Sequence, residues 1–213
     1  AEGEHYKITV SNKMKSKNGM SMGDGFTGYF ATNYSFNLDP EGIAALNGKR
    51  NLIVCISDIH LGADLSYSEF DRNGNGNGAA LVDFLNKVAI APNIKELVIA
   101  GDFLDEWFVP SNVDTYQGKT QAEFVARIAA VHKNVIDAFN KIITDGKIKV
   151  TYVPGNHDLT ITGAAIESIL PGISQARDVK GLGTYSPDGH PEISIEHGHR
   201  YDYFCAPDPI SNR

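Results

Sequence analysis

The stretch Leu52-Ile53-Val54-Cys55-Ile56-Ser57-Asp58-Ile59-His60 decides how the rest of the sequence is interpreted. Its first part is a short, continuous apolar run, which is the pattern of a parallel strand buried on both faces. The run leads directly into Asp58 and His60, two side chains that can bind a metal ion. The stretch therefore predicts a strand of an α/β sheet with a site at its carboxyl end.

Three later segments repeat this pattern of an apolar run followed by polar ligands. They are Leu97–Ala100 followed by Gly101-Asp102, Ile148–Val153 followed by Gly155-Asn156-His157-Asp158, and Ile193–Glu196 followed by His197-Gly198-His199. In an open α/β sheet the carboxyl ends of parallel strands share one edge. We therefore expect these side chains to converge although they lie far apart in the sequence.

Helical patterns separate the predicted strands. Apolar residues recur at helical spacing over 81–88, and a long amphipathic stripe runs from the capping box Thr120-Gln121-Ala122-Glu123 to Gly146. A short helix is expected over 164–170. Strands that alternate with helices predict an α/β fold whose sheet is largely parallel at its centre.

The first fifty residues are less regular. Tyr6–Val10 and Tyr29–Phe36 are predicted to form short strands, and the Lys- and Gly-rich stretch 13–25 between them predicts a loop or hairpin connection. We expect residues 1–50 to be an N-terminal extension of the same domain as residues 51–213.

Composition limits the class of protein. The chain has 213 residues, 42% hydrophobic residues and a net charge of −7, which suits one domain of ordinary hydrophobicity. Its apolar runs are too short for a transmembrane segment. The acidic balance argues against nucleic acid as a partner, because a polyanion is normally bound by a basic face. The chain begins with Ala1, which removal of a signal peptide, trimming, or the absence of part of the chain would each explain, so the compartment stays open with a lean towards export.

The ligand types suggest a particular chemistry. Carboxylate, imidazole and amide-oxygen donors suit Mn, Fe, Zn, Co or Mg. Asp58 and His60 can bind one ion, while Asp102 has two oxygens and can bridge to a second ion about 3.5–4 Å away. Asn156 and His197 would complete the visible shell of that second ion. Two such ions can clamp the oxygens of a displacement at phosphorus and activate a water molecule.

The four blocks, in this order, resemble the successive signature blocks of the calcineurin-like metallophosphoesterases. They are Asp58-Ile59-His60, Gly101-Asp102-Phe103-Leu104-Asp105, Gly155-Asn156-His157-Asp158 and His197-Gly198-His199, and the match spans residues 52 to about 205. Each block alone is weak evidence, whereas all four in order, each after a strand, are strong evidence.

The resemblance implies a β-sandwich flanked by helices, in four α/β/β/α layers, and a phosphoesterase with two divalent metal ions. It implies that Asp58 and His60 hold one metal, that Asp102 bridges, and that Asn156 and His197 hold the other. His157 would protonate the leaving oxygen or stabilise charge on the phosphoryl group, with Asp158 as its orienting partner. The stretch 101–107 also looks like the second block of the branch that cleaves UDP-2,3-diacylglucosamine, so the expected substrate is a phosphorylated small molecule or lipid precursor.

The sequence departs from the family pattern at its end. The family's pattern closes with a Gly-His-x-His block, and none follows His199. We expect that a C-terminal segment carrying this block is missing from the sequence. An alternative alignment makes His197-Gly198-His199 the last block and Gly189-His190 the fourth; His197 is a ligand in both.

Two further interpretations stay open at this point. A protein with this fold that has lost turnover would be a binding or scaffold protein, and the absent block favours it if the chain is complete. A nuclease is the second rival, although the net charge opposes it. Of the other candidates, His132 is expected to be a packed or interface histidine, and Trp107 is expected to cover the edge of the core. His199 is expected either to contact a metal ligand or to lie at the surface.

Overall fold

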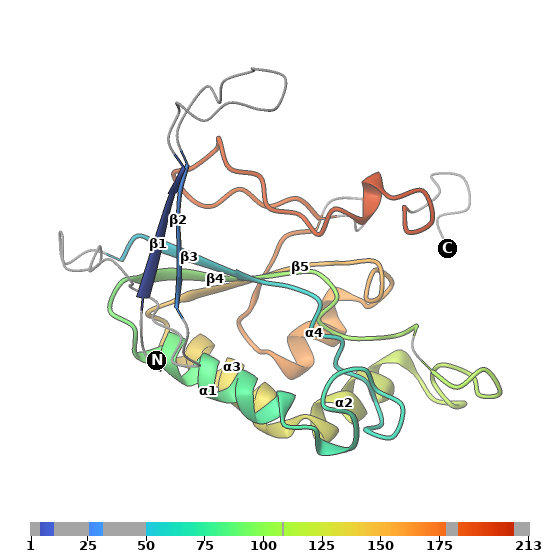
Figure 1. The fold of residues 1–213 in the computed structure, drawn as a ribbon. Coiled ribbons are helices and arrows are strands. Elements are labelled where there is room, and N and C mark those ends of the chain that lie inside the picture. Colours follow the sequence, from blue (N-terminus) through green and yellow to red (C-terminus); the bar gives the residue numbers. More distant parts are fainter. Residues whose placement is uncertain (1–4, 11–25, 32–49, 108, 178–182, 207–213) are drawn as a thin grey trace. The chain divides into compact units, whose positions relative to one another are not determined.

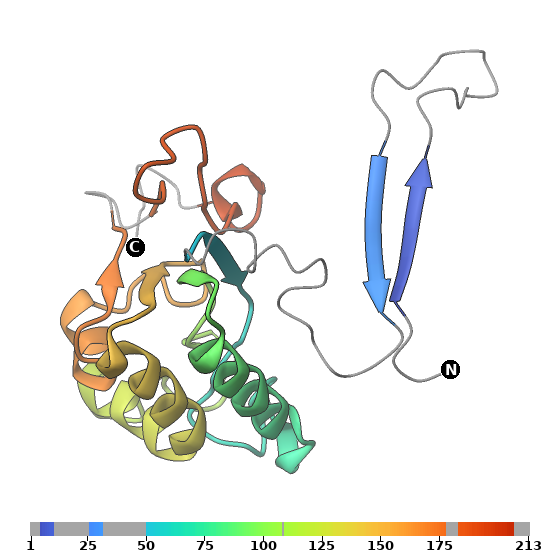
Figure 2. The same ribbon diagram turned by 90° about the vertical axis from the view of Figure 1, so that its left-hand side faces the viewer.

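The computed structural model describes residues 5–10, 26–31, 50–107, 109–177 and 183–206. The chain divides into two compact units, Ala1–Pro40 and Glu41–Arg213. In the first unit, β1 (His5–Val10) pairs antiparallel with β2 (Phe26–Ala31), which confirms two strands there (Figure 2). The second strand begins earlier than expected, and residues 32–36 of the predicted strand lie outside the described residues. That residues 1–50 belong to the same domain as residues 51–213 stays a prediction.

The second unit is built on one parallel sheet. Its strands are β3 (Leu52–Ile56), β4 (Ile94–Ala100), β5 (Lys149–Val153) and β6 (Ser174–Gln175), in that spatial order (Figure 1). All neighbouring pairs are parallel. The predicted α/β class with a parallel sheet is confirmed, and the carboxyl ends of the strands share one edge.

Helices connect these strands. They are α1 (Asn77–Ile90), α2 (Gln121–Val131), α3 (Lys133–Asp145) and α4 (Gly163–Ile169), with two short 3-10 turns, η2 (Arg72–Gly74) and η3 (His199–Tyr201). Figures 1 and 2 show α1 and α3 side by side along one face of the sheet. Among the described residues, no helix combines the length and apolarity needed to cross a bilayer.

The long helix expected from the capping box to Gly146 is two helices. The capping box is present, because the Thr120 side chain accepts from the Glu123 N–H and Glu123 binds back to Thr120. The chain breaks at His132, which has φ −105° and ψ 37°. The imidazole is buried, with Nε2 3.0 Å from the carbonyl oxygen of Gly62. The apolar stripe continues across the break, so periodicity alone predicts one helix.

The expectation that the first strand is buried on both faces is wrong. Within the described residues β3 lies at the edge of the sheet; four of its residues are half-buried, and the side chain of Cys55 is exposed. A continuous apolar run therefore predicts a parallel strand, but it does not predict whether that strand is central or at the edge of the sheet.

The segment 183–206 differs from the prediction of a fourth strand. Ile195 makes only an isolated antiparallel bridge to Tyr185, with N–H···O distances of 2.7 and 2.8 Å. This segment lies on the face of the sheet opposite α1 and α3 (Figure 1). Within the described residues of the second unit, this face carries no further named strand, so the second sheet of the four-layer sandwich stays a prediction.

Candidate metal centre

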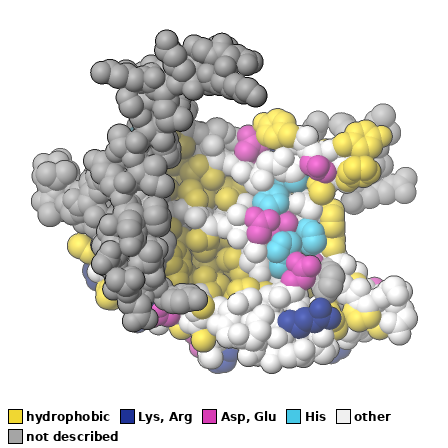
Figure 3. Space-filling view, viewed as in Figure 1, with side chains coloured by type: hydrophobic (Ala, Val, Ile, Leu, Met, Phe, Trp, Pro, Cys, Tyr) yellow, Lys and Arg dark blue, Asp and Glu magenta, His cyan; other side chains and the backbone are white. Residues whose placement is uncertain are grey.

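The polar side chains that follow β3 and β4 are locked together by backbone hydrogen bonds beyond the ends of the strands. The Asp58 N–H donates to the Gly101 carbonyl at 3.2 Å, and the His60 N–H donates to the Asp102 carbonyl at 2.9 Å. A further parallel bridge joins Leu61 to Leu104. Figure 3 shows histidine and acidic side chains gathered in one area of the surface. The ladder therefore sets the relative positions of the predicted ligands.

Three of these residues have an unusual backbone conformation. Asp58, His60 and Asp102 have φ of 55°, 55° and 51°. Residues other than glycine rarely adopt this left-handed region, and such strain concentrates at functional sites.

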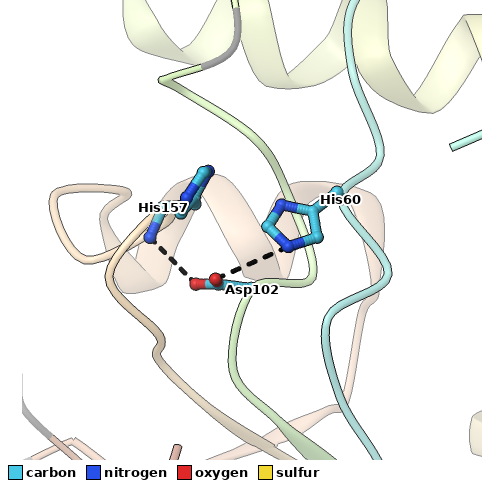
Figure 4. A group of neighbouring side chains, drawn as sticks. All are labelled: His60, Asp102 and His157. Atoms are coloured by element: carbon cyan, nitrogen blue, oxygen red, sulfur yellow. Dashed lines mark hydrogen bonds and ion pairs between the residues drawn. The ribbon is translucent and has the colours of Figure 1, made fainter. Parts of the chain in front are cut away.

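Asp102 is the centre of the cluster. It is 3% exposed, and its Oδ2 lies 3.7 Å from Nε2 of His60 and 3.3 Å from Nε2 of His197. Its Oδ1 accepts the backbone N–H of His157 at 2.9 Å. Figure 4 shows His60 and His157 beside the carboxylate of Asp102. A Cβ at Gly155 would lie 2.1 Å from Oδ1 of Asp102, so the position requires glycine.

Two groups of donor atoms meet at Asp102. One comprises His60, Asp102 and His157, the other Asp58, Asp102 and His197, and within each group the atoms lie within 4.8 Å of one another. Ligands of one ion with bonds of about 2.0–2.2 Å are at most about 4.4 Å apart, so small adjustments would let each group bind a cation. Asn156 Oδ1 lies 3.0 Å from Nε2 of His197. The structure thus brings together all five predicted ligands, Asp58, His60, Asp102, Asn156 and His197.

His197 is fixed from both sides of its ring. Nδ1 lies 2.9 Å from the Ala100 carbonyl, which makes Nδ1 the donor and directs Nε2 at Asp102 and Asn156. The Asp102 contact raises the pKa of His197 to about 9, against a lowering by burial. A proton on Nε2 and a metal ion beside it are alternative ways to satisfy the two facing oxygens.

Burial alone would raise the pKa of Asp102. Hydrogen bonds from His197 and from the His157 N–H outweigh that effect, and the pKa is lowered. Asp102 is therefore an ionised carboxylate at neutral pH, as a metal ligand must be.

Asp105 is a functional residue that the sequence analysis missed. It is 2% exposed, with Oδ2 3.4 Å from Nδ1 of His60 and Oδ1 3.0 Å from Nδ1 of His157. The Asp105 contact raises the pKa of His60. Burial lowers the pKa of His157, but Asp105 outweighs this and the pKa is raised. A carboxylate behind an imidazole fixes its tautomer and orientation. The available signal was a second carboxylate three residues after Asp102.

The structure places Asp158 away from the position expected for an orienting partner of His157. Its buried carboxylate accepts the backbone N–H groups of Phe103, Leu104 and Gly155 at 2.8, 3.2 and 2.7 Å. Burial raises the pKa of Asp158, and the hydrogen bonds from the Gly155 and Leu104 N–H groups lower it by less, so the pKa is raised. Asp158 therefore ties the loop after β5 to the loop after β4, and Asp105 has the place next to the His157 imidazole.

Two other side chains border the cluster. Trp107 stacks on the His157 ring, with centroids 4.6 Å apart and planes at 29°, and is 52% exposed. His199 is 4% exposed, so it is not a surface histidine, and its ring centroid lies 5.4 Å from that of His197. Burial lowers the pKa of His199.

Comparison with known proteins adds the family. The family model described as Calcineurin-like phosphoesterase matches residues 52–210. No curated protein matches the chain. A solved structure, the crystal structure of Pseudomonas putida nuclease MPE, is 20% identical with a TM-score of 0.32, a similarity too low to support an argument about this chain. The alignment covers 58% of this chain and 46% of that one, so the chain spans about half the length of its relative. The family match covers most of the sequence and includes every candidate ligand, and the chain belongs to the calcineurin-like phosphoesterase family.

Proposed function

We propose that this protein is a dinuclear metal-dependent phosphoesterase that hydrolyses a phosphate ester or a pyrophosphate bond with a metal-activated water molecule. The observation that carries the proposal is the position of Asp102. Its buried carboxylate belongs to both donor groups, one with His60 and His157 and the other with Asp58 and His197. A carboxylate shared in this way is the arrangement expected of a ligand that bridges two ions.

The chain's own donors fit hard and borderline divalent ions. Asp58, His60 and Asp102 would hold one ion, and Asp102, Asn156 and His197 the other. Asp58 lies between the two positions, because its carboxylate is grouped with His197 and its Oδ1 is also 4.0 Å from Nε2 of His60. Oxygen and imidazole donors suit Mn, Fe, Zn, Co or Mg, and soft thiolates do not contribute. Such ions, when bound, lower the pKa of water and neutralise charge on a phosphoryl group.

His157 is the proposed proton donor to the leaving oxygen. The Asp105 carboxylate beside Nδ1 stabilises the protonated imidazole and holds its ring plane. Nε2 is then the nitrogen that can give a proton away. Asp158 contributes from behind, because its bonds to the Phe103 and Gly155 N–H groups keep the His157 loop against the end of β4.

The proposed substrate is a phosphorylated small molecule or lipid precursor. The net charge of −7 disfavours capture of a polyanion by electrostatics alone. A salt titration of nucleic-acid binding tests this: affinity that is measurable and falls steeply with salt would make nucleic acid the better substrate class.

The activity test uses purified protein supplied with Mn²⁺ and two aryl esters, a phosphate monoester and a phosphodiester. We expect cleavage of at least one ester, its loss on chelation, and its loss in D102A. D102N is the matched variant, because its amide oxygen can still accept the His157 N–H and preserve the local fold. Turnover that survives both chelation and D102A would overturn the proposal. A protein that takes up no metal and cleaves neither ester would favour the binding or scaffold role.

A further inference from the structure

Glu106 is a buried carboxylate that the proposed chemistry does not use directly. It lies between Asp105 and Trp107 in the loop after β4 and is 5% exposed. Its oxygens accept hydrogen bonds from three neutral donors, the Tyr116 hydroxyl at 2.5 Å, the Gln121 amide at 3.0 Å and the Thr160 hydroxyl. A carboxylate is costly to bury, so a buried one with this many specific donors implies a positional role.

The three donors come from three separate segments. Tyr116 belongs to the turns before α2, Gln121 is the first residue of α2, and Thr160 lies in the loop between His157 and α4. Gln121 strengthens the connection, because its amide also donates to the Thr160 carbonyl at 3.1 Å and its oxygen accepts the Thr162 N–H at 3.0 Å. Glu106 therefore joins the loop after β4 to the loop that carries His157.

Residues 105 to 107 contact His157 in three different ways. The Asp105 carboxylate lies beside Nδ1, the Glu106 N–H donates to the His157 carbonyl at 3.1 Å, and the Trp107 indole stacks on the ring. The Glu106 side chain accepts hydrogen bonds from Tyr116, Gln121 and Thr160. Its hydrogen bonds thus hold the three-residue segment that holds the imidazole.

We propose that Glu106 is a positioning residue for proton transfer by His157. The inference rests on the proposed function, in which His157 protonates the leaving oxygen. Loss of the Glu106 contacts would let the 105–107 segment shift, and small displacements of a catalytic group reduce the rate strongly.

The rates for two esters with different leaving groups separate a role in proton transfer from a general structural role. A general structural role would slow both esters equally. An alkyl ester needs a proton on its leaving oxygen, whereas a p-nitrophenyl ester leaves readily without one. We expect E106Q to lower kcat about 10–100-fold for the alkyl ester and less than about threefold for the p-nitrophenyl ester. E123Q is the matched control, since Glu123 also binds a threonine near the start of α2 but is exposed, and it should slow neither ester selectively.

Fluorescence tests the same contact without turnover. Trp107 is the only tryptophan in the sequence and follows Glu106 directly. In metal-free protein, E106Q should raise the accessibility of Trp107 to acrylamide, and E123Q should not. Wild-type protein that takes up no metal and cleaves neither these esters nor a pyrophosphate would defeat the proposed function, while this measurement would still test whether Glu106 positions the segment.

Equal slowing of both esters by E106Q, or unchanged quenching of Trp107, would overturn the inference. If E106Q does not fold, T160V and Y116F each remove one donor and leave Glu106 in place. They should show the same preference for slowing the alkyl ester with a smaller amplitude, and equal slowing of the two esters by both variants would contradict the proposal.

Discussion

The ends of β3 and β4 and the segment 183–206 supply ligands to the same cluster by different means. Asp58, His60 and Asp102 are held by a backbone ladder that continues past the strands. His197 belongs to a segment with one isolated bridge, and its ring is positioned by Ala100, Asn156 and Asp102. At the ends of β3 and β4, secondary structure holds the candidate ligands in place. In the segment 183–206, the contacts of the His197 side chain help to hold the segment itself.

This difference makes His197 both a candidate ligand and an attachment point. A second attachment lies at the start of the segment, where the Tyr185 hydroxyl donates to the buried Glu96 at 2.6 Å. Changes at the strand ends should therefore affect chemistry without loosening the fold, whereas changes at His197 should affect both.

The largest contrast is expected between H60A and H197A. Loss of a residue that only hydrogen-bonds to a metal ligand weakens metal binding roughly 10–100-fold. Each of these variants should weaken it by more, because each removes a proposed ligand. H197A should also expose the segment 183–206 to limited proteolysis, and H60A should not. Equal protease resistance in the two variants would break the distinction between the regions.

D105N tests the strand-end region alone. The neutral amide would no longer stabilise the protonated imidazoles of His60 and His157, so the pKa of each should fall. We expect activity to fall about 10–100-fold, with His197 unaffected. Histidine titrations followed by NMR measure this, and a lowered His197 pKa alongside the other two would show that the regions are not independent.

The pH dependence of the metal-free protein tests the His197 region. The pKa of His197 is raised from 6.5 to about 9, so its contribution to stability is fully present below about pH 6.5 and lost as the pH rises through about 9. Urea unfolding with chelator should show this loss, and H197Q should lack it. Metal binding should strengthen over the same window because the ion displaces the proton. A wild-type profile identical to that of H197Q would contradict the assignment.

The smallest effect is expected for Y185F. It removes the hydrogen bond to Glu96, which keeps its contact with the Thr151 hydroxyl, and the bond from Lys149 Nζ, which keeps its contact with Asp188. The free energy of unfolding should fall by about 1 kcal/mol, with metal affinity nearly unchanged. Urea denaturation and metal titration measure the two quantities. A large loss of metal affinity would mean that Tyr185, and not the ring of His197, positions the segment.

The same comparison explains what the sequence could predict. Asp58, Asp102 and Asn156 follow apolar runs in a parallel sheet, and strand geometry brings such ends to one edge. His197 was predicted to be a ligand because it stands fourth in a series of motifs. The strand predicted to precede it, Ile193–Glu196, is not formed. Ile193–Glu196 has the composition of a strand, yet pairing depends on a partner that local pattern does not reveal.

The partners of His157 were beyond prediction for a related reason. Asp158 is adjacent in sequence, but the turn at Gly155 directs its carboxylate to backbone donors across the sheet edge. Asp105 comes from another strand end and reaches His157 only through the fold. At the break between α2 and α3, the His132 imidazole contacts the Gly62 carbonyl, seventy residues away in the sequence, and local pattern does not reveal such a contact.

The most direct test of the central claim is the number of metal ions bound per chain, measured by elemental analysis after dialysis. If Asp102 is shared by two ions, wild-type protein should bind two and D102N should lose both while remaining folded. Wild-type protein that binds none, or D102N that still binds two, would contradict the account.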